Sequence, residues 1–145
     1  MPEVKKLVLI EQSAPLMFEL VDRVEDYPQF LPWCGGTELI ERSEAVTAAR
    51  IHINYHGIRA DFATRNDKVI ARHITIRLVE GPFHHLEGTW DFTPLGETAC
   101  KIQFGLRYEF SNKLLGKALG PVFHHIANTF VDSFVRRAER IHPNG

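Results

Sequence analysis

The sequence predicts an α+β domain in which a curved antiparallel sheet wraps around one long C-terminal amphipathic helix. Three observations support this fold class. Polar and apolar residues alternate with a period of two from residue 37 to residue 110, with turn signals at strand spacing. A broad apolar stripe at helical spacing follows and ends near residue 141. A chain of 145 residues has room for one core, so we expect a single domain spanning residues 1–145.

The composition limits the function classes. Hydrophobic residues make up 44% and charged residues 24% of the chain, as in ordinary globular proteins. A net charge of −1 argues against DNA binding or general nucleic-acid binding, although a local basic face stays open. No signal peptide is visible, and the longest apolar run, Leu7–Ile10, is too short to span a membrane. We therefore expect a cytoplasmic protein, with peripheral contact to the inner membrane left open. Cys34 and Cys100 are expected to be buried thiols.

The N-terminal third predicts a strand, a helix and an irregular segment. Lys5–Gln12 forms the strand. Ser13 offers an N-cap oxygen and Pro15 fits the first helical turn, so the helix covers Ala14 to about Arg23. Tyr27–Cys34 contains two prolines and several large apolar residues, which predict one helical turn followed by an ordered, lid-like segment.

Six further strands are predicted, which makes seven in all. They cover Thr37–Arg42, Ala45–Tyr55, Ile58–Arg65, Val69–Val79, His84–Phe92 and Thr98–Phe110. Turn signals lie between them at His56–Gly57, Asn66–Asp67, Gly81–Pro82 and Gly96–Glu97, of which Asn66–Asp67 is a clear hairpin signal.

The last helix is predicted to begin after Ser111 as its cap and to end near Ile141. Its apolar stripe is the only one long enough to cover the concave face of the sheet. Gly120–Pro121 should kink or split the helix, because proline removes a backbone hydrogen bond and crowds the preceding turn.

Several blocks carry a family resemblance. Val24–Cys34 resembles the signature of the family that joins bacterial ribosome-association toxins to coenzyme Q-binding proteins, within the START-like, or polyketide cyclase-like, superfamily. Leu78–Phe83, Leu86–Phe92 and Phe123–Ala138 resemble later blocks of the same family, in the expected order. The resemblance implies a helix-grip fold, with a seven-stranded sheet around the C-terminal helix and a cavity between them.

The resemblance also implies two different functions. Coenzyme Q-binding members hold a polyprenylated quinone and support respiration without catalysis. Toxin members bind the large ribosomal subunit and block its joining with the small one, as part of a toxin–antitoxin pair. Our leading hypothesis is non-enzymatic binding of a hydrophobic small molecule such as ubiquinone, with no cofactor required; the ribosome-directed toxin is the alternative and a polyketide cyclase the third.

The ligand hypothesis depends on a set of inward-facing residues, which core filling alone would also explain. Tyr55 and Tyr108 bring hydroxyls to this apolar surface, and Arg72 falls in register with inward isoleucines, where an unpaired guanidinium would be costly. The full predicted set is Tyr55, Phe62, Arg72, Ile74, Ile76, Trp90, Phe92, Phe104, Leu106, Tyr108, Phe123, Ile126 and Phe130.

The lid-like segment has two interpretations. Tyr27, Phe30, Leu31 and Trp33 either plug one end of the core or form a gate that touches a membrane surface, and we favour the plug.

Ribosome binding needs cations that face phosphates. The candidates lie on the last helix, although we favour an ordinary solvated face as their explanation: Lys113, Lys117, Arg136, Arg137 and Arg140.

Metal and nucleophile chemistry are poorly supported. In His84–His85 and His124–His125 the two side chains diverge, so neither pair builds a metal site alone. The inward positions offer few acid or base groups, which disfavours catalysis.

Overall fold

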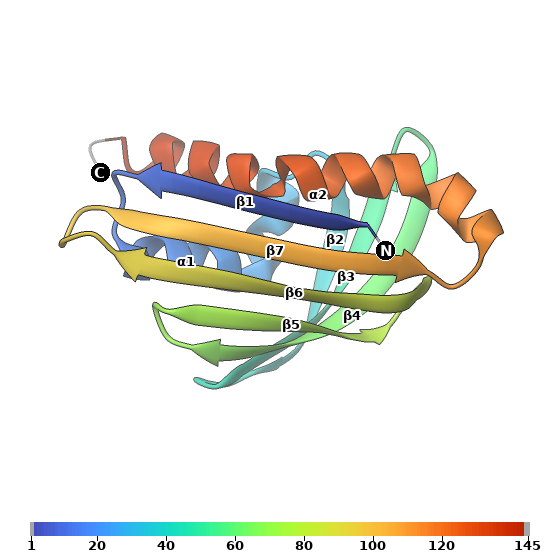
Figure 1. Ribbon diagram of the computed structural model, residues 1–145, viewed down its shortest axis with the longest axis horizontal. Coiled ribbons are helices and arrows are strands. Elements are labelled where there is room, and N and C mark those ends of the chain that lie inside the picture. Colours follow the sequence, from blue (N-terminus) through green and yellow to red (C-terminus); the bar gives the residue numbers. More distant parts are fainter. Residues whose placement is uncertain (1, 144–145) are drawn as a thin grey trace.

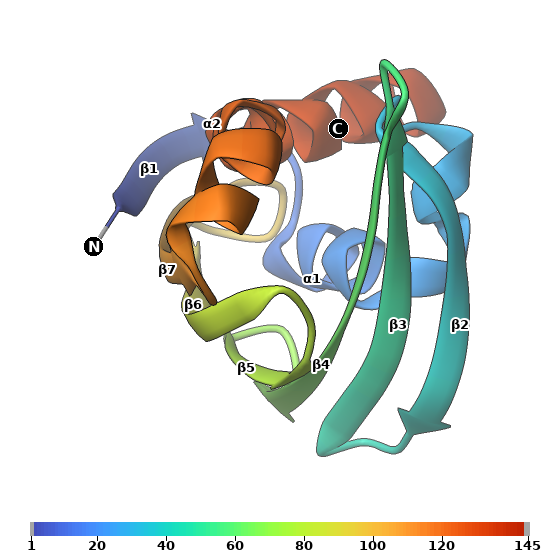
Figure 2. The same ribbon diagram turned by 90° about the vertical axis from the view of Figure 1, so that its right-hand side faces the viewer.

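The seven predicted strands form one antiparallel sheet that curves around α2 (Lys113–Ile141), as Figures 1 and 2 show. This computed structural model describes residues 2–143. The sheet order is β1-β7-β6-β5-β4-β3-β2, so β1 is the only strand not beside its sequence neighbour. The strands are β1 (Glu3–Ile10), β2 (Cys34–Arg42), β3 (Val46–Tyr55), β4 (Ile58–Val69), β5 (His73–Glu80), β6 (Phe83–Pro94) and β7 (Cys100–Phe110). The α+β helix-grip prediction is confirmed.

Two short helices, α1 (Ala14–Asp22) and the 3-10 helix η1 (Val24–Gln29), connect β1 to β2 and close one end of the curved sheet. As predicted, Ser13 caps α1: its Oγ accepts a hydrogen bond of 3.2 Å from the Leu16 backbone N–H. The Tyr27 hydroxyl donates to the Val21 carbonyl at 2.5 Å, which fixes η1 against α1. The segment from η1 to β2 is therefore ordered, as expected.

The predicted hairpin at Asn66–Asp67 is wrong. β4 continues through both residues to Val69, and Asp67 pairs with Thr75 on β5 and with Val46 on β3. Tertiary contacts override the turn propensity of these residues, because a ladder forms on both sides of them. The turn instead lies at Ile70–Arg72, where Ala71 adopts a positive φ of 62°.

This shift also corrects the place of Arg72. The residue was predicted to face inward in register with Ile74, but it lies in the turn and is exposed. Its guanidinium donates to the carbonyl of Ala71 at 3.1 Å. An exposed turn position leaves the charge hydrated, so the expected cost of burial does not arise.

α2 is one continuous helix, although its first turns are inclined to the rest in Figure 1. Its cap is Asn112 rather than the predicted Ser111, since the Asn112 Oδ1 accepts from the Leu115 backbone N–H at 2.9 Å. Pro121 lies inside the helix without splitting it.

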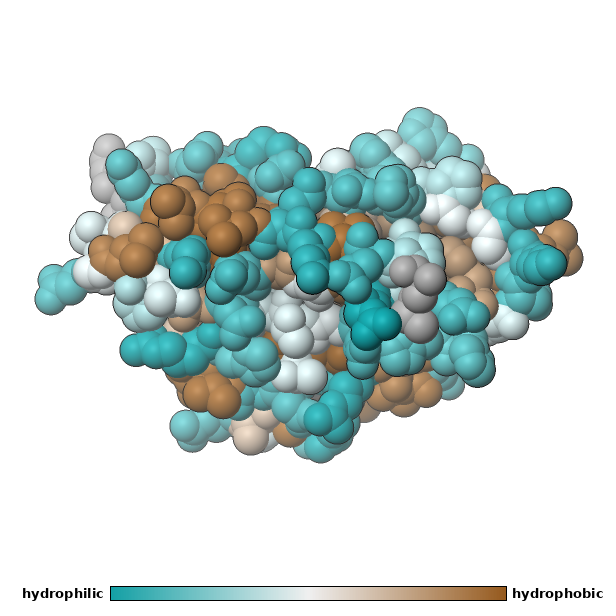
Figure 3. Space-filling view, viewed as in Figure 1, coloured by the Kyte–Doolittle hydropathy of each residue, from teal (hydrophilic) through white to brown (hydrophobic). Residues whose placement is uncertain are grey.

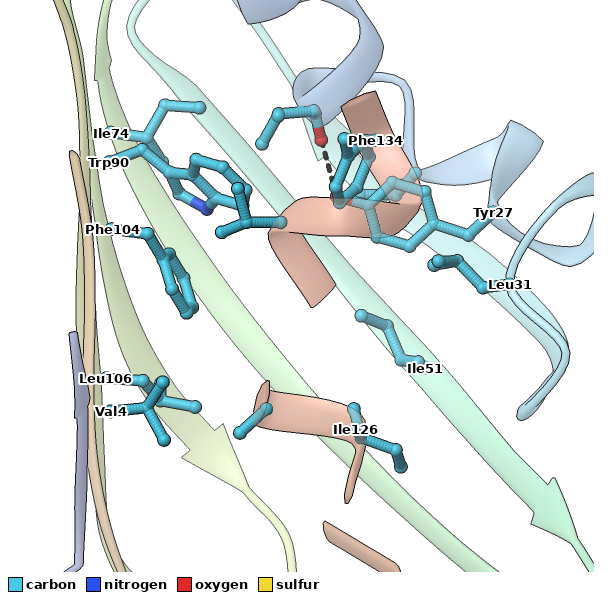
Figure 4. Packing of buried hydrophobic residues seen from close by; sticks show 14 of the residues in the cluster. Val4, Tyr27, Leu31, Ile51, Ile74, Trp90, Phe104, Leu106, Ile126 and Phe134 are labelled. Carbon is cyan, nitrogen blue, oxygen red and sulfur yellow. Dashed lines mark hydrogen bonds between the residues drawn. The ribbon is translucent and has the colours of Figure 1, made fainter. Parts of the chain in front are cut away.

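The core lies between the sheet, α2 and the lid segment, and it is strongly aromatic. Trp90 and Phe104 reach from the sheet toward Phe134 of α2, and Tyr27 reaches in from η1 (Figure 4). Ring centroids of Trp90 and Phe134 lie 5.5 Å apart, and those of Tyr27 and Phe134 lie 5.4 Å apart, both edge to face. This cluster holds the lid and the C-terminal half of α2 to the sheet.

Gly81 is the glycine whose place is set by close packing. It has a φ of 154°, and a Cβ there would lie 2.7 Å from the Cβ of Phe62. The turn between β5 and β6 therefore needs glycine to pass over β4.

Cys34 and Cys100 are free and buried, as predicted, and burial raises the pKa of both thiols. Within residues 2–143, no helix is both long and apolar enough to span a membrane.

Candidate functional site

A small apolar cavity of about 70 Å³ lies between the concave face of the sheet and α2. At about 10–15 Å³ per water, it has room for about five waters, and it is smaller than the cavity of about 150 Å³ that binds one benzene ring in another protein. The lining comes from the sheet, α1, the lid segment and α2: Val21, Val24, Tyr27, Trp33, Ile51, Phe62, Thr64, Asn66, Ile76, Leu86, Trp90, Phe104, Leu106, Phe123, Ile126, Ala127 and Phe130.

The structure brings eight of the predicted ligand residues to this cavity. They are Phe62, Ile76, Trp90, Phe104, Leu106, Phe123, Ile126 and Phe130. Alternation along β4, β6 and β7 placed these strand residues on the inner face, and the helical stripe placed the others opposite them.

Five predicted residues lie elsewhere. Ile74 and Phe92 are fully buried beneath the lining, and Phe92 packs edge to face on Phe18 of α1. Tyr108 packs on Phe123 with ring centroids 4.7 Å apart, and burial raises its pKa. The remaining two lie at the surface: Tyr55 is half-exposed and Arg72 is exposed.

The lid residues divide between lining and packing. Tyr27 and Trp33 line the cavity, and Leu31 is buried beside it. The alternative interpretation, a gate that touches a membrane, requires exposed aromatic rings. Each of these three residues is at most 4% exposed, so they offer no such surface. Phe30 is half-buried and packs on Phe134.

Sequence reasoning missed the polar part of the lining. Thr64 and Asn66 follow Phe62 on the inner face of β4. Thr64 lay in the predicted strand, in register with Phe62, but was not chosen, and Asn66 was hidden by the erroneous hairpin. The Oδ1 of Asn66 and the Nε1 of Trp33 are buried without a hydrogen-bond partner among the described residues. The missed apolar lining residues, such as Val21 and Ile51, follow from the helical and strand periods once the bounds of the elements are known.

α2 also carries the predicted basic residues, and its charge contrasts with the rest of the chain. Between Lys113 and Ile141 there are five basic and two acidic residues, a formal charge of +3 in a chain of net charge −1. The acidic residues are Asp132 and Glu139, both exposed. The rest of the chain therefore carries a formal charge of −4, against +3 on this helix.

The basic residues of the sheet are mostly neutralised by carboxylates. Seven basic residues on strands have a carboxylate oxygen within 4 Å: Lys5, Arg42, Arg50, Arg65, Lys68, Arg77 and Arg107. In the described part of the chain, the basic strand residues that lack such a partner are Lys6, Arg59 and Lys101. Across residues 2–143 none of the five basic residues of α2 has such a partner.

Arg137 differs from the other four basic residues of α2. Its Nη2 donates to the Gln29 Oε1 at 2.8 Å, and its guanidinium lies 5.1 Å from the ring centroid of Phe30. It therefore joins α2 to the lid, whereas Lys113, Lys117, Arg136 and Arg140 are exposed.

Among residues 2–143, no three His, Cys, Asp or Glu side chains gather as a metal-ligand set. The two histidines of α2 diverge as expected. His124 contacts the Asn128 amide, and His125 stacks on Tyr55.

A curved antiparallel sheet that grips one long helix over an apolar cavity defines a helix-grip protein. Residues 10–135 match the family described as "polyketide cyclase / dehydrase and lipid transport". The ribosome association toxin RatA of Escherichia coli K12 is 40% identical over 142 residues, which cover 98% of this chain and 90% of RatA. The chain therefore belongs to this family, in the group that includes RatA.

More distant similarities agree with this placement. The coenzyme Q-binding protein COQ10 homolog B of Xenopus laevis is 24% identical over 134 residues, 90% of this chain and 55% of that protein. The crystal structure of the Zhui aromatase/cyclase of Streptomyces sp. R1128 superposes with a TM-score of 0.81 at 20% identity, covering 96% of this chain and 94% of that one. At this identity the likeness shows the fold alone.

Proposed function

We propose that this protein associates with the ribosome in the manner of a RatA-type toxin, contacting the large subunit through the exposed basic residues of α2. The observation that carries this proposal is that none of these residues has an ion pair among residues 2–143, whereas most basic residues of the sheet do. A cation already paired with a carboxylate loses that partner when it binds a phosphate, so unpaired cations are the ones available for RNA.

The relatives support the same proposal. RatA is named for ribosome association, and its 40% identity spans nearly the whole of both chains. The COQ10 homologue is more distant. The distribution of charge and the similarity to RatA therefore favour ribosome association over the quinone hypothesis.

Co-sedimentation with purified bacterial ribosomal subunits tests this proposal. The wild-type protein should pellet with large subunits at low salt and be released as salt rises. The double variant Lys113→Glu/Lys117→Glu should bind more weakly. Its plot of the logarithm of the binding constant against the logarithm of the salt concentration should be less steep, by about 0.7–0.9 for each lost phosphate contact. Lys6→Glu/Lys101→Glu is the matched control, because these cations lie on the sheet and also lack ion pairs. Equal loss in both variants, or no pelleting of the wild type, would contradict the proposal.

A second candidate function is binding of a hydrophobic ligand in the cavity, for which ubiquinone was the leading hypothesis. The apolar lining and the unpartnered Trp33 Nε1 favour it, since an indole N–H can donate to a carbonyl. At about 70 Å³ the cavity is too small for a quinone ring unless its lining moves apart, and a polyprenyl tail would also need to pass between Phe62 and Phe123, whose ring centroids lie 6.2 Å apart. Beyond this pair a smaller apolar space continues toward Leu119. Native mass spectrometry of protein purified from a quinone-rich host should then detect a bound quinone; repeated absence would contradict this candidate.

A cyclase activity is the least supported function. The described lining residues include no carboxylate, histidine or amine, and burial raises the pKa of its one tyrosine, Tyr27. The Tyr27 hydroxyl already donates to Val21. We therefore propose a binding protein rather than an enzyme.

A further inference from the structure

A cluster of three aromatic rings lies at the surface where the β3–β4 hairpin meets α2. Tyr55 ends β3, His56 occupies the turn, and His125 projects from α2. The rings of Tyr55 and His125 are parallel within 6°, with centroids 5.6 Å apart, which is an offset stack. The His56 ring meets Tyr55 edge to face at 4.1 Å. We call Tyr55, His56 and His125 the aromatic platform.

The platform is open to solvent. His56 and His125 are exposed and Tyr55 is half-exposed, although a tyrosine on the inner register of a strand is ordinarily buried. None of the three side chains forms a hydrogen bond or ion pair with another described residue. By contrast, His52 and His73 on the sheet are each bound to a carboxylate. The parts of His56 and His125 that do not face Tyr55 are therefore available to a ligand.

The backbone of the hairpin turn is unusual at the same place. His56 has a positive φ of 51° and precedes Gly57 at 81°. Glycine takes this conformation at lower cost, and histidine is among the few other residues that adopt it with some frequency.

An exposed ridge of α2 links the platform to two cations. Lys113, Lys117, Pro121 and His125 are spaced four residues apart, and all four are exposed. Each step turns about 40° around the helix axis, so Lys117 lies about 80° and Lys113 about 120° around the helix from His125. At about 1.5 Å per residue, Lys117 lies about 12 Å and Lys113 about 18 Å along the axis from His125. Neither lysine has an ion pair in residues 2–143.

From this arrangement we infer that the platform stacks an unpaired base of RNA, while Lys117 and Lys113 bind phosphates of the same strand. Open aromatic faces beside unpaired cations are the two features that single-stranded nucleic-acid sites combine, with site sizes from about 4 nucleotides. This inference deepens the proposed ribosome association, on which it rests: it assigns a single-stranded loop or bulge of ribosomal RNA, rather than ribosomal protein or duplex, as the part contacted.

Variants of the platform test the inference. His125→Ala and Tyr55→Leu each remove a stacking ring, and we expect each to weaken co-sedimentation with large subunits about 5- to 150-fold. His56→Asn removes the third ring while keeping a residue that tolerates positive φ. Tyr55→Phe retains the ring and should bind as the wild type does. His85→Gln, at a half-buried histidine of β6 that lies 3.2 Å from a Glu87 carboxylate oxygen, is the control.

A direct probe separates RNA from protein contact. The probe is a fluorescein-labelled single-stranded RNA of about 12 nucleotides and mixed sequence, within the range of site sizes of single-stranded binders. Its fluorescence anisotropy should rise when wild-type protein is added at low salt, and the same strand in an RNA duplex should bind more weakly. Near-ultraviolet circular dichroism and thermal unfolding of each variant verify the fold. If His125→Ala destabilises the helix, His125→Gln replaces it, since glutamine keeps helical propensity and removes the ring.

The outcomes distinguish the two proposals. If the wild type does not pellet with ribosomal subunits, the proposed function fails. If it pellets and the platform variants pellet equally well, ribosome association stands and the platform inference is overturned. Preference of the protein for the duplex probe would also overturn it.

Discussion

The two halves of α2 differ in what they contact. From Ala127 onward the helix buries a row of side chains against the sheet, α1 and the lid: Ala127, Val131, Phe134 and Ala138. No residue of α2 before Phe123 is buried, and Leu114 is 77% exposed. The C-terminal half therefore supplies stability, whereas the N-terminal half buries little, carries the exposed Lys113 and Lys117, and leads to the aromatic platform.

One helix can therefore close a core with its C-terminal half and leave its N-terminal half exposed to a binding partner. The aromatic cluster holds the C-terminal half strongly enough that the N-terminal half needs few contacts. Residues in the N-terminal half can therefore change, or bind a partner, at little cost to the fold.

The largest effect is expected from Phe134→Ala. Phe134 packs on Trp90, Tyr27 and Phe130, and it is 1% exposed. Its removal should lower the free energy of unfolding by about 3–5 kcal/mol, through lost burial and a cavity. Urea unfolding at pH 7 measures this. A loss below about 1 kcal/mol would mean that the C-terminal half is not the anchor of the helix.

An intermediate effect on the free energy of unfolding is expected in η1, which contains Glu25 and leads into the lid segment. The Arg42 guanidinium binds both carboxylate oxygens of Glu25 and lowers its pKa to about 2. A depressed carboxyl pKa stabilises the fold above the ordinary value of about 4.5, and this contribution is lost as pH falls toward 2. Because the pair is partly exposed, Glu25→Gln should cost at most about 1 kcal/mol at pH 7.

Unfolding of both proteins at a series of pH values checks the sign of this effect. The difference between wild type and Glu25→Gln should shrink as pH falls from 4.5 toward 2. Glu44→Gln, at an exposed carboxylate with no ion pair among the described residues, should show no such trend. A difference that is constant with pH would contradict the role of the Glu25–Arg42 pair.

The smallest effect is expected from Leu114→Gln in the first turn of α2. An exposed leucine contributes little to burial, so the free energy of unfolding should change by less than about 0.5 kcal/mol. Chemical denaturation compares this variant with Phe134→Ala. A cost near that of Phe134→Ala would erase the distinction between the two halves.

The sequence alone predicts the architecture well because its signals are local. The alternation on β7 and the stripe of α2 identify the elements, and the cap at Ser13 places the start of α1 within one residue. The turn at Asn66–Asp67 failed because pairing on both sides outweighs the turn propensity of two residues. That one error moved Arg72 inward and concealed Asn66.

The candidate site is less predictable, for a physical reason. Alternation shows which face a residue lies on, but not whether that face meets the cavity, solid core or solvent. Phe104 and Phe92 both face inward, yet only Phe104 lines the cavity. The stacking of Tyr55 on His125 depends on where the hairpin meets the helix, which no sequence period encodes.

The pairing of β1 with β7 has a consequence for synthesis of the chain. Ile10 pairs with Cys100, so the first strand has no partner until about ninety more residues have been made. At about 5–20 residues per second this interval lasts roughly 5–20 seconds. β1 also exposes Leu7 and Leu9 in the folded protein, at 58% and 68%, and this end of the strand forms a hydrophobic area in Figure 3. A nascent chain therefore carries an unpaired, apolar strand beside the ribosome until the last strand emerges, and during that interval it is a substrate for chaperones or for pairing with a second chain.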